Sequence, residues 1–270
     1  VLVLIWRVKK VVYLKTEEEI ELIRESSLLV GKTLAEVARI IEPGVNTLVL
    51  DSIAEEFIRD NGGVPGFKGL YDFPNTLCIS INSQVVHGIP SIEPLKNGDI
   101  VSVDCGVLMN GFYGDVAYTF EVGEVSKEIR RLLDTTKQCL QAGISAAVAG
   151  NRTGDIGNAV QKLAEDNGYS VVRELVGHGL GKKLHEDPQV PNYGRRGQGP
   201  KLKEGLVIAI EPMINMGKRH VRQDEDGWAI VTKDGLPSAH FEHDVVVRKG
   251  SAEILSTHDF VEEVLKNKNK

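Results

Sequence analysis

An internal repeat constrains the fold of this chain more than any other feature. A shift of 106 positions brings Thr47 onto Thr153 and Gly44 onto Gly150, and it superposes the Asp-Asn-Gly triplets that end two amphipathic segments. Taken together, these matches indicate a duplication. The alternative is that two unrelated amphipathic helices ending in Asn-Gly look alike.

Each copy is expected to begin with a pair of helices. A capping box at Thr16 predicts the start of the first helix, which ends before Pro43. Thr47 is expected to cap the second helix, and Thr153 is expected to cap its counterpart in the second copy. Strand-rich sequence follows the first helix pair from residue 76 to residue 122.

The predicted fold class is therefore α+β, with two pseudo-symmetric halves and a central antiparallel sheet covered by helices. A site between such halves would draw residues from both. No linker separates the halves, so residues 13–255 are expected to form a single catalytic domain. Residues 1–12 are expected to be an N-terminal extension of unclear status and residues 256–270 a C-terminal tail.

Charge and cysteine usage exclude several classes of function. A net charge of -6 leaves no basic surface for nucleic acid. The apolar run Val1–Trp6 is too short to cross a membrane or to form a signal sequence. The three cysteines, Cys78, Cys105 and Cys139, lack CxxC spacing and are odd in number, which argues against a zinc knuckle and a disulfide framework. A cytoplasmic location is expected.

Two aspartates fall on one face of a predicted β-hairpin. Asn110-Gly111 is a strong hairpin signal between two apolar strands. A two-residue turn there places Asp104 opposite Ala117 and Asp115 opposite Gly106, so the aspartates are diagonal neighbours. Their repulsion should raise one pKa unless a cation neutralises them. A solvated pair on an exposed face is the alternative.

Three more candidate ligands come from the second copy. Glu211 ends an apolar strand, Glu242 lies in another, and His178 stands between glycines. A lone histidine of this kind is more often structural than a ligand, but four buried carboxylates without a metal would cost many kcal/mol. Two divalent cations would balance the four charges, and oxygen-rich ligation with one nitrogen favours Mn, Fe(II), Co or Zn.

The order Asp, Asp, His, Glu, Glu resembles that of the methionine aminopeptidase family of the pita-bread (creatinase/aminopeptidase-like) fold, in its short bacterial type I form. The resemblance runs from Tyr13 to about Ile254, and only 31 positions separate Glu211 from Glu242, too few for the helical insertion of type II enzymes. The combination is highly specific. Beside the two aspartates, its motifs are Cys78–Pro90, Gly177–Gly181, His185–Val190, Ile210–Met213 and Phe241–His243.

The resemblance implies a role for each metal ligand. Asp104 would chelate one of two metal ions, Asp115 and Glu242 would bridge both, and His178 and Glu211 would complete the shell of the second ion. The ions would activate the water that attacks the first peptide bond.

The resemblance also implies catalytic residues. Glu211 would carry a proton from the attacking water to the leaving amine. His87 and His185 would contact the substrate and stabilise the tetrahedral intermediate. The alternative for these two is that they are ordinary histidines in Gly/Pro-rich loops.

A methionine pocket is implied at Phe73, Cys78 and Trp228, since sulfur and aromatic walls suit a thioether. Trp228 as core filler is the alternative. Leu70 and Leu184 depart from a common family pattern in which aromatics occupy these positions, which puts the shape of the pocket in doubt.

The implied function is removal of the N-terminal methionine from nascent proteins and peptides when the second residue is small. The implied partners are nascent polypeptide N-termini, with the ribosome surface as a further candidate, and a monomer is expected. Two other readings stay open: a proline-directed peptidase, which usually carries an extra N-terminal domain, and a pita-bread binding module without catalysis, which typically lacks the ligands.

Overall fold

The first helix begins as its capping residues predict. The computed structural model describes residues 11–268, so most of the expected N-terminal extension lies outside the described residues. Helix α1 (Glu17–Ile40) starts after Thr16, whose hydroxyl accepts the Glu19 N–H while the Glu19 carboxylate accepts the Thr16 N–H. This reciprocal pair satisfies two amide groups that have no partner inside the helix.

The predicted caps of the second helix in each copy are wrong by one position. Helix α2 (Thr47–Asp60) is capped by Asn46, and Thr47 is its first helical residue. The Thr47 hydroxyl is instead hydrogen-bonded to the backbone of Ser91. Helix α4 (Thr153–Asp166) is capped by Arg152, so Thr153 is likewise its first helical residue. Threonine can cap a helix, but here its hydroxyl has a tertiary partner.

The helix bounds agree with the duplication. Both ends of α2 and α4 lie 106 positions apart, and so do the last residues of α1 and of α3 (Lys127–Ala146). The loops repeat the same contact, because Leu95 donates its N–H to the carbonyl of Val45 and Leu202 donates to that of Asn151. The two halves therefore share backbone geometry as well as sequence.

Strands follow each helix pair. In the first half the elements that follow the helix pair are β1 (Val64–Pro65), the 3-10 turn η1 (Leu70–Asp72), β2 (Leu77–Ile81), β3 (Gln84–Val86), β4 (Ile100–Met109) and β5 (Phe112–Glu121). In the second half they are β6 (Ser170–Val171), β7 (Gly177–Gly179), β8 (Glu186–Val190), β9 (Val207–Ile210), β10 (Met213–Asn215), β11 (Val221–Gln223), β12 (Ile230–Thr232), β13 (Ser238–His240), β14 (His243–Val246) and β15 (Glu253–Ile254).

The strands pair antiparallel, and the predicted hairpin register is confirmed. Across β4 and β5, Asp104 pairs with Ala117 and Asp115 with Gly106. In one sheet β5 pairs with β4 along its whole length, while β1 and β2 pair with different stretches of β4. Another sheet has the order β15-β14-β9-β7-β8. The halves meet where Glu242, just before β14, donates its N–H to the Ala117 carbonyl at 3.0 Å. We call this junction of β5 with residues 240–244 the seam.

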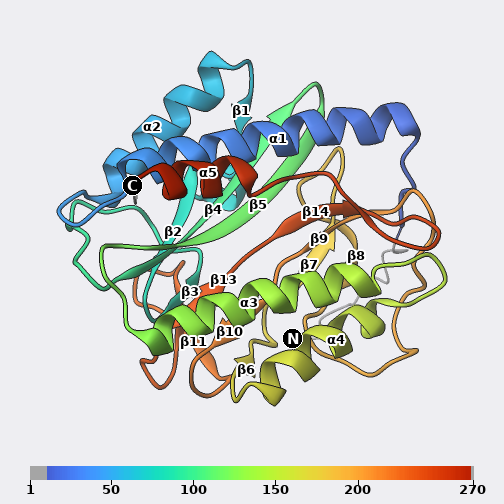
Figure 1. Cartoon of the computed structure of the whole chain (residues 1–270). Helices are drawn as coiled ribbons and strands as arrows, with labels where there is room; N and C mark the ends of the chain where they lie inside the picture. Colours follow the sequence, from blue (N-terminus) through green and yellow to red (C-terminus); the bar gives the residue numbers. More distant parts are fainter. Residues whose placement is uncertain (1–10, 269–270) are drawn as a thin grey trace, which may run out of the picture.

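Helices cover one side of the strands (Figure 1). Helix α1 packs on β4 and β5, and α3 packs on β9, β10 and β13. A continuous core of aliphatic and aromatic side chains fills the space between these layers. This arrangement is the expected α+β fold with two related halves. Within residues 11–268, no helix has both the length and the apolar character needed to span a bilayer.

The segment expected as a C-terminal tail contains a helix. Helix α5 (Asp259–Lys268) lies beside α1 (Figure 1) and buries Val261. It has only 10 residues, and half of them are charged, which gives only a weak helical signal, so its order depends on packing against α1.

Replacing Gly114 by alanine should destabilise the fold, because β5 passes directly against the backbone of α1. A Cβ atom on Gly114 would lie 2.6 Å from the carbonyl carbon of Ser26 and would also overlap the amide of Ser27. We expect Gly114→Ala to lower the free energy of unfolding by about 2–3 kcal/mol, measured by urea denaturation. Val64→Ala, at a half-exposed position of β1, should change it by less than about 0.5 kcal/mol. Equal values for the two variants would contradict the close approach.

Candidate active site

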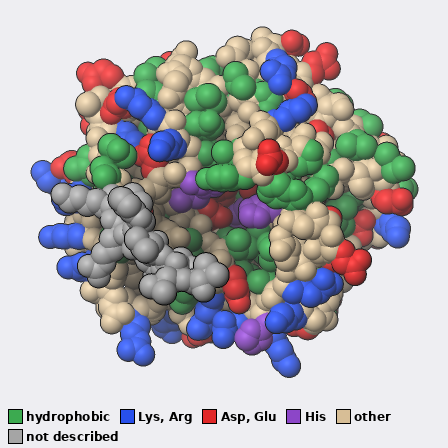
Figure 2. All heavy atoms as spheres, turned by 180° about the vertical axis from the view of Figure 1, so that it is seen from behind, with side chains coloured by type: hydrophobic (Ala, Val, Ile, Leu, Met, Phe, Trp, Pro, Cys, Tyr) green, Lys and Arg blue, Asp and Glu red, His purple; other side chains and the backbone are tan. Residues whose placement is uncertain are grey.

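A single cleft brings together every residue that the sequence singled out. It has a volume of about 530 Å³ and is lined by residues of both halves. It opens on the face opposite the helices, where Figure 2 shows a hollow with histidine and acidic side chains inside and hydrophobic side chains around it. The predicted residues that line it are Phe73, Cys78, His87, Asp104, Asp115, His178, His185, Glu211, Trp228 and Glu242.

Four carboxylates converge on the floor of this cleft. Asp104 and Asp115 come from the β4–β5 hairpin, Glu211 follows β9, and Glu242 lies between β13 and β14. Asp115 and Glu242 are only 3% and 2% exposed. The Oδ1 atoms of Asp104 and Asp115 are buried without a hydrogen-bond partner. Buried oxygen atoms of this kind are costly unless something binds them.

His178 completes the cluster. Its Nδ1 lies 2.9 Å from the Gly179 carbonyl, which can only accept, so Nδ1 carries the hydrogen and Nε2 keeps a free lone pair. That Nε2 is 3.7 Å from Asp115 Oδ2 and 3.6 Å from Glu211 Oε1. Ligand atoms of Asp115, His178 and Glu242 all lie within 4.8 Å of one another. This spacing fits a shared cation.

Burial sets the protonation behaviour of the cluster. It raises the pKa of Asp104 to about 7, and it raises the pKa values of Asp115, Glu211 and Glu242 well above the usual range, with the neighbouring acidic groups adding to the effect in these three. Burial also lowers the pKa of His178 to about 3, so its imidazole is neutral near pH 7. Four acids with one neutral imidazole make a donor set suited to divalent cations of the Mn, Fe(II), Co and Zn group.

One end of the cleft is apolar. Phe73 and Cys78 are buried there, and the Trp228 ring meets Phe73 edge-on at 5.2 Å between centroids. Leu70 and Leu184 also line the cleft, so the two departures from the family pattern act directly on its shape. Sulfur and ring faces are well suited to a flexible apolar side chain.

The two remaining predicted histidines also line the cleft. His185 is exposed and its ring meets that of His178 edge-on at 4.5 Å. His87 is half-buried and has a left-handed backbone with φ of 60°. Burial lowers the pKa of both imidazoles. Each is therefore a neutral ring that offers one N–H donor to a molecule in the cleft.

Sequence reasoning missed two polar residues behind the cluster. His240 Nε2 lies 3.8 Å from Glu211 Oε2. Asp244 Oδ2 accepts hydrogen bonds from the Asp115 amide and the Ser27 hydroxyl, both at 2.7 Å. His240 and Asp244 flank Glu242 at a spacing of two, and the two-residue alternation of extended chain could have placed all three on one face.

Comparison with known proteins agrees with this site. Residues 21–249 match the model of metallopeptidase family M24. The chain is 51% identical to a methionine aminopeptidase of Clostridium perfringens, over 91% of this chain and 98% of that protein, and 45% identical to methionine aminopeptidase 1 of Bacillus subtilis, over 90% and 98%.

Solved structures give the same result. A methionine aminopeptidase from Rickettsia prowazekii is 39% identical, with a TM-score of 0.90 over 92% of this chain and all of that one. A prolidase from Pyrococcus furiosus, at 24% identity and a TM-score of 0.75, shares the fold and is longer, since the match covers 65% of it. These findings confirm the resemblance seen in the sequence: the chain belongs to metallopeptidase family M24, a family of metal-dependent hydrolases, and within it to the methionine aminopeptidases.

Proposed function

We propose that this protein removes the N-terminal methionine from peptides and nascent polypeptides whose second residue is small, and that it uses two divalent ions to do so. The observation that carries the proposal is the meeting, in one cleft, of four carboxylates and a neutral imidazole with an apolar end. The carboxylates and the imidazole can hold metal, and the apolar end can hold one apolar side chain.

The metal ligands would divide between two ions. Asp104 would bind one ion, Asp115 and Glu242 would bind both, and His178 and Glu211 would bind the other. The partnerless buried oxygens of Asp104 and Asp115 support this assignment. When bound, the ions would polarise the scissile carbonyl and lower the pKa of the attacking water. Mn, Fe(II), Co and Zn all suit the donor set.

The side chains around the ions would move the protons and hold the substrate. Glu211 would take a proton from the attacking water and pass it to the leaving amine, and its raised pKa supports transient protonation. His87 and His185, as neutral N–H donors, would stabilise the oxyanion of the tetrahedral intermediate.

The apolar end would select the substrate. Phe73, Cys78 and Trp228 would enclose the methionine side chain, and the next side chain would meet the walls of the cleft near His87 and His185. The protein would act as a monomer on nascent chains, with the ribosome surface as a candidate partner. A preference for Xaa-Pro peptides has less support, because the likeness to prolidases extends only to the fold.

Removal of metal should abolish activity. We expect a chelator to stop release of methionine from Met-Ala-Ser and Mn(II) or Co(II) to restore it, because the water would be activated only beside the ions.

Asp115→Asn and Glu242→Ala should each lower kcat far more than they raise KM. Asp134→Asn, an exposed acid on α3, is the matched control and should behave as wild type. Full turnover by metal-stripped protein would refute the mechanism.

Metal-free protein should lose stability as the pH rises from 6.5 to 8. Burial raises the pKa of Asp104 and of Asp244 to about 7, and the other three carboxyls are raised as well. Above pH 6.5 the folded state therefore holds protons that the unfolded state has already lost, and losing them lowers the free energy of unfolding. Buried histidines with lowered pKa values oppose this trend below about pH 7.5, because unfolded imidazoles, with a pKa of about 6.5, still hold protons there.

The expected loss is on the order of 1–2 kcal/mol. Thermal unfolding in the presence of a chelator at pH 6.5, 7.2 and 8 would measure it, and saturating Mn(II) should remove the trend. A stability of the metal-free protein that stays level or rises over this range would contradict it.

Cleavage should require methionine at the first position and Gly, Ala or Ser at the second. Trp228→Ala should relax the first requirement, because loss of one wall costs about 1–3 kcal/mol of discrimination, or roughly 10- to 200-fold in kcat/KM. Competition between Met-Ala-Ser and Leu-Ala-Ser would measure it, with metal content as the control. Equal release of Leu and Met by the wild type would overturn the methionine assignment but not the two-metal peptidase.

A further inference from the structure

The segment after residue 255 reaches the back of the strands that carry the metal ligands. The match to the family model ends at residue 249, so this segment lies outside it. Ser256 and His258 lie between β15 and α5 and are directed toward the seam.

His258 binds a backbone carbonyl that takes part in the seam. Its Nε2 lies 3.1 Å from the Ala117 oxygen, which can only accept, so Nε2 donates. The same oxygen accepts the Glu242 N–H at 3.0 Å. Ala117 also faces Asp104 across the hairpin. One carbonyl thus joins His258 to the backbone of Glu242, and the residue that carries it lies opposite Asp104 in the hairpin.

The segment also packs against the residues that follow Glu242. The rings of His258 and His243 stack at 4.0 Å with 28° between their planes. Ser256 Oγ is hydrogen-bonded to His243 Nδ1 at 2.7 Å and accepts the Asp244 N–H at 3.2 Å. Because neighbouring side chains alternate in extended chain, His243 and Glu242 point to opposite sides. The segment therefore supports this strand from the side away from the cleft.

Helix α5 holds the segment in place. Lys268 donates to the carbonyls of Ala38 and Ile41, at 3.1 and 3.2 Å, where α1 ends. Helix α1 and the segment approach so closely that a Cβ atom on Gly31 would lie 2.8 Å from the Thr257 carbonyl oxygen. A glycine within α1 is thus explained by the segment that it contacts.

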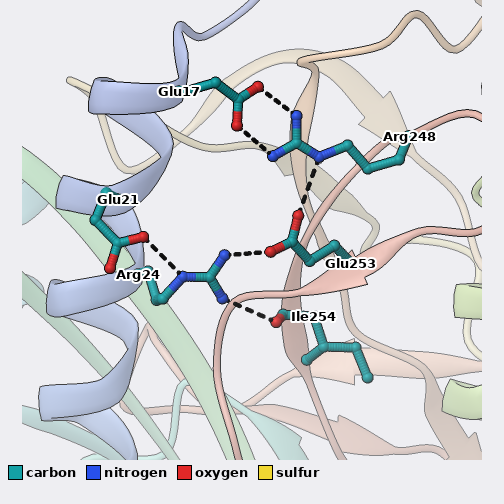
Figure 3. Close-up of polar contacts among 6 residues, drawn as sticks. All are labelled: Glu17, Glu21, Arg24, Arg248, Glu253 and Ile254. Atoms are coloured by element: carbon teal, nitrogen blue, oxygen red, sulfur yellow. Dashed lines mark hydrogen bonds and ion pairs between the residues drawn. The ribbon is translucent and has the colours of Figure 1, made fainter.

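Ion pairs secure the chain just before this segment. Figure 3 shows Arg24 of α1 joined to the Glu253 carboxylate and the Ile254 carbonyl, and Arg248 joined to Glu253 and Glu17. The segment is therefore attached to α1 on both sides of His258, which fixes where the imidazole lies.

We infer that His258 is a positioning residue for the divalent metal site: through the Ala117 carbonyl it holds the seam, and so keeps Glu242 in register with Asp104 and Asp115. This inference rests on the ligand set of the proposed function. Residues that support metal ligands without touching the ion affect metal affinity by about 10- to 100-fold.

The test compares three variants of the full chain by calorimetric titration with Mn(II) and by the absorption spectrum with Co(II). His258→Ala should weaken the binding of Mn(II) at least about 10-fold and alter the Co(II) spectrum. His258→Gln, whose amide can still donate to Ala117, should recover most of both. Lys268→Ala removes only the attachment at the far end of α5 and leaves those at Glu253, Ile254 and the buried Val261, so it should lower the Tm and weaken Mn(II) binding much less than His258→Ala does.

Wild-type binding by His258→Ala, or equal weakening by Lys268→Ala, would overturn the inference. If His258→Ala does not fold, His258→Asn, whose amide is too short to reach the carbonyl, takes its place with the same expectation. Asp115→Asn in the same titration tests the ligand set separately. Undiminished Mn(II) binding by that variant would refute the proposed function, whereas a normal His258→Ala beside a defective Asp115→Asn refutes only the role of His258.

Discussion

Burial of four crowded carboxylates in one cleft is the constraint on which the rest of this structure depends. Left to themselves, Asp104, Asp115, Glu211 and Glu242 would separate or take up protons, because burial raises the pKa of all four and neighbouring acidic groups raise it further in the last three. They stay together because each lies on a strand, or directly beside one, whose position is fixed by backbone hydrogen bonds and a buried core. Holding the carboxylates together thus lowers the stability of the metal-free fold, and binding of a cation would offset this electrostatic cost.

The sequence predicted those parts of the site that depend on local rules. The Asn110-Gly111 turn fixed the hairpin register, and with it the placement of Asp104 and Asp115 on one face. No local rule of this kind connects His178, Glu211 and Glu242, which lie in or directly beside strands far apart in the chain. Their grouping followed from balancing charge and from the family resemblance, and only the folded chain brings them into one cleft.

What the sequence could not predict was decided by tertiary contacts. The cap of α2 was misplaced by one residue because Ser91, remote in sequence, binds the hydroxyl of Thr47. His240 and Asp244 had no recognised motif, and their partners lie on other elements. Helix α5 has too short and too polar a sequence to be recognised without the surface of α1 that it covers.

The internal duplication bears on how such a site came to exist. Asp104 and Glu211 lie within one position of the 106-residue shift, so each half contributes an acid from the equivalent strand. In an ancestor made of two identical half-length chains, a site on the twofold axis would have carried matching ligands from both partners. After fusion into one gene, the two halves no longer have to carry matching ligands. Each copy could then diverge alone, which accounts for the present asymmetry of the buried cluster: the first half contributes two carboxylates, and the second half contributes two carboxylates and an imidazole.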